Sequence, residues 1–248
     1  MSRLIQRWLL PFFDPRATFR LAALPGYIAE LRSFRRSEVA FPVRFNDTHP
    51  CLSDRTAVTP FDPHYFYQSA WLARRLTMVR PTAHVDIGSS VVMIGVISAI
   101  VPTTFVDIRP LVQDLPDLKC LKGSITAVPF PARSQASLSC LHVIEHIGLG
   151  RYGDPIDPDG YKKGLAELRR VLAPNGRLYL STPVGRQRVC FNAHRVFAPD
   201  TILAEMPELK LLSFSLVDDD RRFHADCPLA CAQGLDYGCG FFELTRES

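Results

Sequence analysis

The chain has 248 residues and a formal net charge of +4, with 47% apolar and 22% charged residues. A chain of this length can bury one sizeable core, and its composition excludes wholesale disorder. We therefore expect an N-terminal extension over residues 1–60 and one globular domain over residues 61–248.

The N-terminal extension is partly helical by its pattern and is interrupted by prolines. Its apolar run over residues 8–13 is too short for a membrane-spanning helix or a signal-peptide core. Arginines alternate with apolar residues, so weak contact with an anionic membrane surface stays open beside a solvated helical face. The sequence has no nucleic-acid-binding motif, and we expect a cytoplasmic protein without a nucleic-acid partner. The arginines are Arg3, Arg7, Arg16, Arg20, Arg32, Arg35 and Arg36.

The seven cysteines are odd in number and include no Cys-x-x-Cys pair, which favours free thiols in a reducing compartment. Four residues near the C-terminus, His224, Cys227, Cys231 and Cys239, have side chains that bind zinc. Their spacing matches no usual zinc finger or ribbon, so we assign no metal.

From Asp62 the pattern becomes regular. Asp62 can cap a helix whose first residue is Pro63, and apolar residues recur at helical spacing up to Leu76. A strand over 83–87, a tight turn over 88–90, a helix over 91–101 and a strand over 104–108 follow. This order is a βαβ unit and predicts a parallel sheet.

Further strands and helices complete an α/β pattern. The last two strands lack an intervening helix and should form an antiparallel pair at one edge of the sheet. The expected strands are 119–121, 137–141, 177–181, 210–217 and 240–245, with helices over 159–172 and from 199 and a turn at 174–176.

The βαβ unit carries a candidate nucleoside site. Asp86 ends its first strand, Gly88 opens a turn of small residues, and Asp107 ends the next strand, where a carboxylate can accept hydrogen bonds from both ribose hydroxyls. The phosphate-binding pattern Gly-x-Gly-x-x-Gly is absent from this turn, where Ser90 and Met93 stand. A ligand with a ribose but no phosphate, such as S-adenosylmethionine, fits these residues best.

The order of these segments resembles the class I S-adenosylmethionine-dependent methyltransferases over residues 65–245. The block HVIEHIGLGRYGDP, residues 142–155, is similar to one in a little-characterised branch of that superfamily. The resemblance implies a Rossmann-like, doubly wound, mostly parallel sheet of seven strands with helices on both faces. It also implies S-adenosylmethionine as the cofactor.

The resemblance also assigns roles to residues. Asp86, Gly88 and Ser89 would line the methionine end of the cofactor, Asp107 would hold the ribose and Ile108 would flank the adenine. Ser124 and Ile125 would lie at the adenine edge, and Leu141 is a further cofactor-binding candidate.

The acceptor side is expected after the fourth strand, because open α/β folds bind ligands at the carboxyl ends of their strands. His142, Glu145 and His146 are the catalytic candidates there, and they can equally cap or brace a helix. By resemblance His194, with Asn192 and Arg195, would face the same pocket. Residues 151–158 are either a rigid loop or a lid over the substrate.

The sequence thus predicts methyl transfer to an oxygen or nitrogen of a small-molecule or glycan-type acceptor. The main alternative is an inactive binding or scaffold protein of the same fold, because Ser90 and Ser124 replace a glycine and an acidic residue common in the family. A nicotinamide-dependent enzyme lacks both the phosphate cradle and a Tyr-x-x-x-Lys pair. A peripheral membrane module led by the basic extension is the remaining alternative.

Overall fold

The computed structural model describes residues 21–37, 41, 43–109 and 111–247. The four arginines before residue 21 and the apolar run over 8–13 lie outside the described residues. The chain divides into two compact units, Met1–Phe61 and Asp62–Ser248. In the described part of the first unit are helix α3 (Leu24–Arg36) and the 3₁₀ turn η1 (Phe45–Asp47). None of the described helices has the length and apolar character that crossing a membrane requires.

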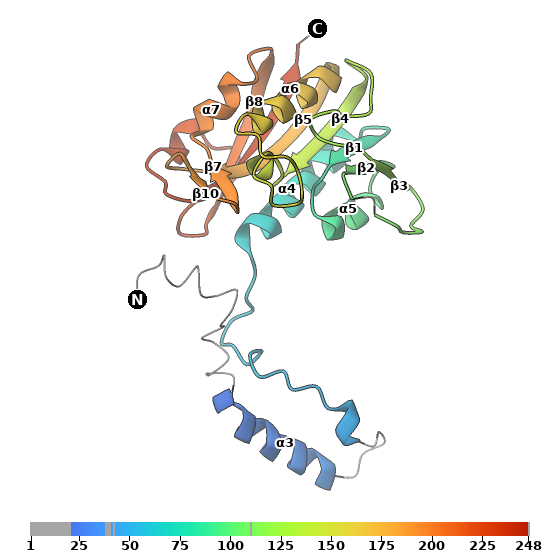
Figure 1. Ribbon diagram of the computed structural model, residues 1–248, viewed down its shortest axis with the longest axis vertical. Helices are drawn as coiled ribbons and strands as arrows, with labels where there is room; N and C mark the ends of the chain where they lie inside the picture. Colours follow the sequence, from blue (N-terminus) through green and yellow to red (C-terminus); the bar gives the residue numbers. More distant parts are fainter. Residues whose placement is uncertain (1–20, 38–40, 42, 110, 248) are drawn as a thin grey trace. The chain divides into compact units, whose positions relative to one another are not determined.

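The second unit is built around an eight-stranded sheet in the order β3-β2-β1-β4-β5-β10-β8-β9 (Figure 1). Strands β3, β2, β1, β4 and β5 are parallel, whereas β10 runs antiparallel to both of its neighbours and β9 pairs antiparallel with β8. The strands are β1 (His84–Ile87), β2 (Thr103–Asp107), β3 (Leu118–Lys122), β4 (Gln135–Leu141), β5 (Leu172–Val184), β8 (Leu209–Val217), β9 (Phe223–His224) and β10 (Gly238–Arg246).

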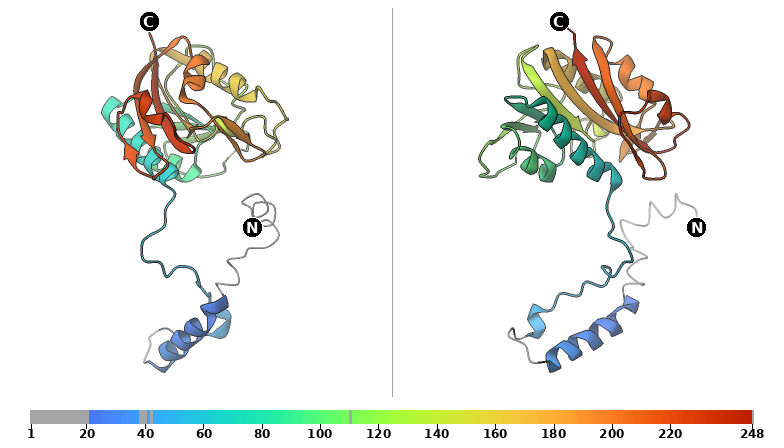
Figure 2. Two further views of the ribbon diagram at one scale, coloured as in Figure 1. Left: turned by 90° about the vertical axis from the view of Figure 1, so that its left-hand side faces the viewer. Right: turned by 180° about the vertical axis from the view of Figure 1, so that it is seen from behind.

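Helices cover both faces of this sheet, as Figure 2 shows from two sides. Helices α4 (Pro63–Val79) and α5 (Val91–Ile97) bury Trp71, Leu72 and Ile94 in one apolar cluster. On the opposite face α6 (Gly160–Val171) and α7 (Pro199–Ala204) pack a second cluster of buried side chains. The Rossmann-like, doubly wound fold is therefore confirmed, together with the antiparallel pairing of the last two long strands.

Helix α4 begins as the sequence predicts. The Asp62 carboxylate accepts hydrogen bonds from the backbone N–H groups of His64 (2.9 Å) and Tyr65 (3.3 Å), and Pro63 is the first helical residue. This cap also determines where His64 and Tyr65 lie, at the end of α4 that adjoins β4.

Two predicted elements differ from the structure. The helix expected over 91–101 ends at Ile97, because residues 98–101 turn to bring the buried Val101 against the sheet before β2. The turn at 174–176 lies within β5, where Asn175 adopts a left-handed conformation (φ 57°) and the register with β4 shifts.

The sequence did not predict three short strands. Strands β6 (Arg188–Cys190) and β7 (His194–Val196) form a separate two-stranded sheet, and β9 contributes two residues to the edge of the main one. Runs of two or three residues are too short to show an alternating pattern.

Candidate functional site

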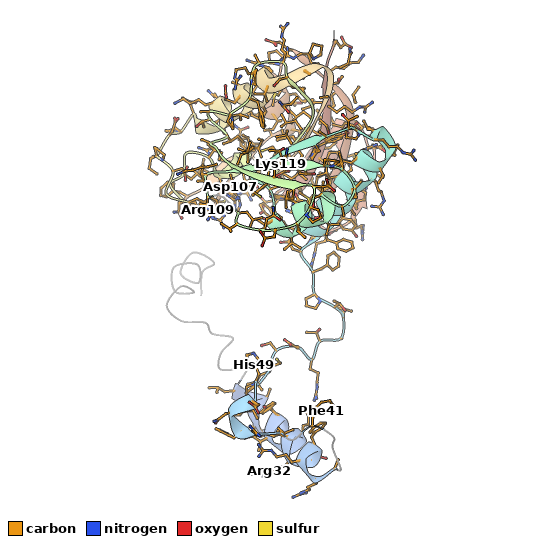
Figure 3. The ribbon with its side chains drawn as sticks, turned by 90° about the vertical axis from the view of Figure 1, so that its right-hand side faces the viewer. Arg32, Phe41, His49, Asp107, Arg109 and Lys119 are labelled. Carbon is orange, nitrogen blue, oxygen red and sulfur yellow. The ribbon has the colours of Figure 1, made fainter. Side chains whose placement is uncertain are left out.

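The candidate site lies at the carboxyl ends of β1, β2 and β4. A cavity of about 100 Å³ opens there, and its wall includes Gly88 after β1, Asp107 at the end of β2, and His142 and His146 after β4. Figure 3 labels Asp107 at the end of β2 and Arg109 on the connection that follows it. Residues that are far apart in the sequence thus meet because parallel strands end at one edge.

The turn after β1 is held from below by a buried carboxylate. Asp86 is fully buried and accepts hydrogen bonds from the backbone N–H (3.0 Å) and the hydroxyl (2.7 Å) of Ser89. The Ser89 hydroxyl in turn accepts the backbone N–H of Leu141 at 2.9 Å, which ties the turn to the end of β4. Asp86, Ser89 and Leu141 therefore lie behind the cavity wall and shape it, while Gly88 forms part of the wall itself.

The same carboxylate extends into a buried polar chain. Ser139 donates to Asp86, and the two ring nitrogens of His84 lie 2.8 Å from the hydroxyls of Ser137 and Ser139. Burial raises the pKa of Asp86 to about 6 and lowers the pKa of His84 to about 3, so His84 is neutral near neutral pH. This series of buried hydrogen bonds joins β1 to β4 in the core of the sheet beneath the site.

Gly88 and Asp107 are neighbours in the cavity wall. Gly88 has φ +70°, and a Cβ there would lie 3.2 Å from the Val143 side chain and 3.9 Å from Oδ2 of Asp107. Oδ1 of Asp107 accepts the backbone N–H of Arg109 at 2.6 Å, which orients the carboxylate. A ligand can approach the backbone at Gly88 while its hydroxyl groups reach Asp107.

A second cavity of about 270 Å³ shares Ile108, Ile125 and Tyr152 with the first and also includes Ser124. The Ser124 hydroxyl lies 2.8 Å from that of Thr126. The Tyr152 ring lies under two guanidinium groups, 4.7 Å from Arg109 and 5.1 Å from Arg151. The predicted adenine-side residues Ile108, Ser124 and Ile125 therefore line one hollow with this aromatic ring.

The loop behind this hollow contains the spacing Gly148-x-Gly150-x-x-Gly153, and all three glycines have positive φ. These glycines follow the 3₁₀ turn η2 (Ile144–His146) and end before α6 begins at Gly160, whereas a phosphate-binding turn joins a strand directly to a helix N-terminus. Asp154, Asp157 and Lys163 line the same cavity, and Lys163 pairs with Asp157 at 2.6 Å, so the carboxylate left to repel a pyrophosphate is that of Asp154.

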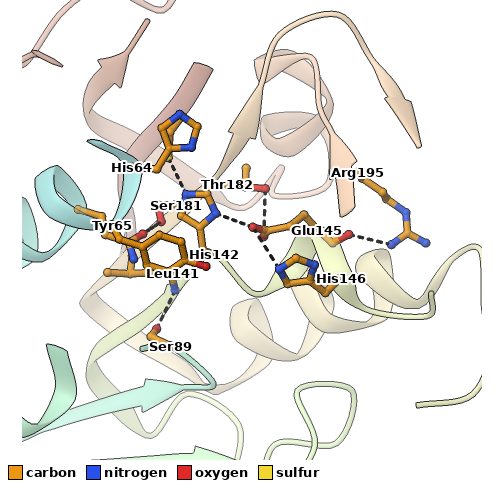
Figure 4. Close-up of polar contacts among 12 residues, drawn as sticks. His64, Tyr65, Ser89, Leu141, His142, Glu145, His146, Ser181, Thr182 and Arg195 are labelled. Carbon is orange, nitrogen blue, oxygen red and sulfur yellow. Dashed lines mark hydrogen bonds and ion pairs between the residues drawn. The ribbon is translucent and has the colours of Figure 1, made fainter. Parts of the chain in front are cut away.

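The acceptor-side candidates form a buried cluster, shown in Figure 4. Oε1 of the fully buried Glu145 lies 2.7 Å from Nδ1 of His142 and 3.8 Å from Nε2 of His146, and Thr182 donates to its other oxygen at 3.5 Å. Burial opposes a charge on Glu145, but His142 lowers the pKa of this carboxyl below its usual value. Glu145 is thus a buried carboxylate between two histidines.

The two histidines differ in their protonation. Burial disfavours a charged His142, yet Cys239 and Glu145 together raise its pKa well above the ordinary value. Burial lowers the pKa of His146 despite Glu145, and Nδ1 of His146 donates to the carbonyl of Ala193 at 2.6 Å. Neutral His146 therefore carries its proton on Nδ1 and leaves Nε2 free to accept one.

The site residues predicted in β7 and just before it are Asn192, His194 and Arg195, and they differ in their surroundings. His194 begins β7 with its ring 5.3 Å from that of Tyr237, and burial lowers its pKa. Arg195 is buried and donates to the carbonyls of Ile147 (2.6 Å) and Pro158 (3.2 Å), so it anchors the loop that carries Tyr152. Neither His194 nor Asn192 lines the two cavities.

Two residues of this region, His64 and Tyr65, were not among the predicted site residues, and Cys239 was considered only with the C-terminal zinc candidates. His64 and Tyr65 stack against His142, with ring centroids 5.5 and 5.1 Å away, and Sγ of Cys239 lies 3.1 Å from its Nε2. The sequence carries no signal for this convergence, because helix α4, the end of β4 and the start of β10 meet only in the folded chain.

The four residues weighed as zinc ligands do not meet at one point, although the side chains of Cys227 and Cys231 are in contact. Nε2 of His224 lies 2.7 Å from the Asp218 carboxylate, whereas Cys239 contacts His142. Within the described part of the chain, the residues whose ligand atoms lie close enough to hold a metal ion are His64, His142 and Cys239, with these atoms within 4.8 Å of one another.

Comparisons with known proteins agree with this architecture. The model of the family described as "Caenorhabditis protein of unknown function, DUF268" matches residues 133–209, which include β4, η2 (Ile144–His146), α6 and the whole of β5. No curated protein matches the sequence.

Several solved structures are similar in fold. A putative methyltransferase from Thermobifida fusca has a TM-score of 0.52 and 13% identity, with 75% of this chain and 81% of that chain covered. The N-methyltransferase NodS from Bradyrhizobium japonicum, in complex with S-adenosyl-L-homocysteine, has a TM-score of 0.51 and 12% identity, with 75% and 89% covered. At this level of identity the likeness defines the fold, which is that of methyltransferases.

Proposed function

We propose that this protein is an S-adenosylmethionine-dependent methyltransferase that acts on an oxygen or nitrogen of a small-molecule or glycan-type acceptor. The observation that carries the proposal is the meeting of Gly88, Asp107 and His146 in one cavity at the carboxyl edge of a methyltransferase-like sheet. The structure of NodS holds the demethylated cofactor on a similar fold, which supports the choice of ligand.

The described residues fit this cofactor. Asp107 offers a carboxylate to the two ribose hydroxyls, Gly88 leaves its backbone open to close approach, and Ile108 and Ile125 supply apolar contact for an adenine. The neighbouring Asp154 disfavours a dinucleotide with its pyrophosphate. When bound, S-adenosylmethionine supplies a methyl group that its sulfonium already activates.

His146 is the general base that we propose for an acceptor that still carries its proton. Its Nδ1 proton is held by the Ala193 carbonyl, so Nε2 has the free lone pair, and the Glu145 carboxylate 3.8 Å away stabilises the cation that proton uptake creates. His142 is less suited to this task because its raised pKa keeps it protonated. Where the acceptor is already deprotonated, positioning alone supplies the rate.

The first test is calorimetric titration of the full-length protein with S-adenosylmethionine and S-adenosylhomocysteine. We expect both to bind, and we expect Asp107→Ala to weaken binding roughly 100-fold or more, because each hydrogen bond to a charged group contributes about 1.5–3 kcal/mol. The matched control is Asp114→Ala, which removes an exposed carboxylate from the same connection between β2 and β3 and should bind as the wild type does.

Two outcomes contradict the proposal. If neither ligand produces heat, the chain is a scaffold that has kept the fold without the cofactor. If reduced nicotinamide dinucleotide binds more tightly than S-adenosylmethionine, the crevice serves an oxidoreductase.

A further inference from the structure

We propose that His64, His142 and Cys239 form a binding site for a divalent cation of the zinc class, beside the cofactor cavity. The metal would take Nε2 of His142, Sγ of Cys239 and a ring nitrogen of His64. Its binding is independent of the proposed methyl transfer.

The three side chains come from distant parts of the fold and converge on one point. His64 stands in the first turn of α4, His142 directly follows β4, and Cys239 lies at the start of β10. Their ligand atoms lie within 4.8 Å of one another, and Nε2 of His142 is 3.1 Å from Sγ of Cys239. Tetrahedral zinc with bonds of about 2.0–2.3 Å holds its ligand atoms about 3.5 Å apart, so modest side-chain rotation closes the site.

The outer nitrogen of His142 is already held as in known zinc sites. Nδ1 of His142 lies 2.7 Å from the carboxylate of Glu145, which is fully buried (Figure 4). Metal-binding histidines commonly donate their other ring N–H to a carboxylate, which fixes the ring and strengthens the ligand. In this arrangement Nε2 is directed at Cys239, and a metal would take the place of the proton that Nε2 carries.

The charge of the cluster also favours a cation. Glu145 is a buried carboxylate, and among the residues that the structure describes no lysine or arginine forms an ion pair with it. Cys239 is fully buried, so its sulfur is poorly placed to attack a bulky substrate. A dication offsets the thiolate and carboxylate together.

The three protein ligands leave a fourth tetrahedral position. Zinc sites with three protein ligands use this position for water or substrate oxygen, whereas structural sites are closed by four. His142 also lines the cofactor cavity, so the open position adjoins the site where the acceptor is expected. If the proposed function holds, the metal would bind the acceptor oxygen and lower its pKa.

The test uses the full-length protein freed of metal and titrated with Co²⁺, whose bond to a thiolate gives a charge-transfer band in the near ultraviolet. We expect one equivalent to bind with this band, and equimolar Zn²⁺ to abolish it. Cys239→Ser should lose the band, and Glu145→Gln should weaken Co²⁺ binding about 10- to 100-fold while keeping the band.

The matched control is Cys227→Ser, which removes a thiol of the C-terminal segment outside the cluster and should leave the band unchanged. Circular dichroism of each variant establishes that it is folded. The proposal is overturned if folded wild-type protein gives no thiolate band, or if Cys227→Ser removes the band and Cys239→Ser does not. Titration of the same samples with S-adenosylmethionine reports the cofactor site separately, so the two proposals fail independently.

Discussion

At the scale of single residues, the most consequential polar group outside the cavities is His84. It is almost fully buried in β1 and bridges Ser137 and Ser139, so only its neutral form fits the core. Its pKa is lowered by burial from 6.5 to about 3. Because the pKa of this histidine is lower in the folded chain than in the unfolded chain, the fold is most stable above the pKa of the unfolded state. This stability is lost as the pH falls below that value.

We therefore expect His84 to lower the unfolding free energy by about 2 kcal/mol as the pH falls from about 7 to about 5. Over this range the unfolded chain binds a proton at this histidine, whereas the folded chain does not. Asp86 acts in the opposite sense, since its pKa is raised to about 6 and its ionisation destabilises the fold as the pH rises. His84→Gln keeps Asp86 and removes the opposing histidine, so the unfolding free energy of this variant should rise, rather than fall, as the pH is lowered from about 7 to 5.

Denaturant unfolding at the two pH values measures this difference. His49→Gln, which changes an exposed histidine, is the control and should retain the dependence of the wild type. Equal slopes for His84→Gln and the wild type would show that His84 is not the acid-sensitive group.

At the scale of elements, the loop after η2 is the segment that shapes the second cavity. Gly148 has φ +77°, its N–H donates to Asp154 at 2.7 Å, and a Cβ there would lie 1.9 Å from the carbonyl oxygen of Asp157. Gly153 has a similar φ of +83°, but a Cβ there would meet nothing within 4 Å. Both glycines therefore have a left-handed backbone, but an added Cβ would collide with a neighbouring residue only at Gly148.

We expect Gly148→Ala to lower the unfolding free energy by at least about 2 kcal/mol more than Gly153→Ala, whose cost is the left-handed backbone alone, about 1 kcal/mol. Gly148→Ala should also weaken S-adenosylmethionine binding, because the displaced loop lines the second cavity. Chemical denaturation and calorimetry of both variants measure these effects. Equal losses in the two variants would mean that the loop accommodates the added methyl group.

At the scale of the whole molecule, the division between Phe61 and Asp62 predicts that the second unit folds by itself. We expect a fragment of residues 58–248, which keeps the Asp62 cap of α4, to match the full chain in S-adenosylmethionine affinity. Its unfolding free energy should lie within about 1 kcal/mol of the value for the same unit in the full chain. Aggregation of the fragment or loss of binding would show that residues 1–57 complete the domain.

The arginines of the N-terminal extension are the residues for which the sequence predicts membrane contact. Arg32, Arg35 and Arg36 lie on α3, which has no buried residue, and the arginines before residue 21 lie outside the described residues. Contact with an anionic membrane surface therefore remains a prediction of the sequence.

Much of the fold followed from the sequence alone. Asp62 and Pro63 mark the start of α4, apolar runs mark β1, β2 and β4, and the spacing from Gly88 to Asp107 predicts where a ribose would be held. These signals are local, because caps, turns and periodicity involve residues a few positions apart.

Only the tertiary structure decided how these pieces meet. It placed Asp86 beneath the turn instead of on the cavity wall, and it brought His64 and Cys239 to His142. Local sequence cannot show such contacts, because a buried position or a shared ligand point depends on which strands become neighbours. The packing of the sheet and its helices determines that order, and with it the chemistry of the site.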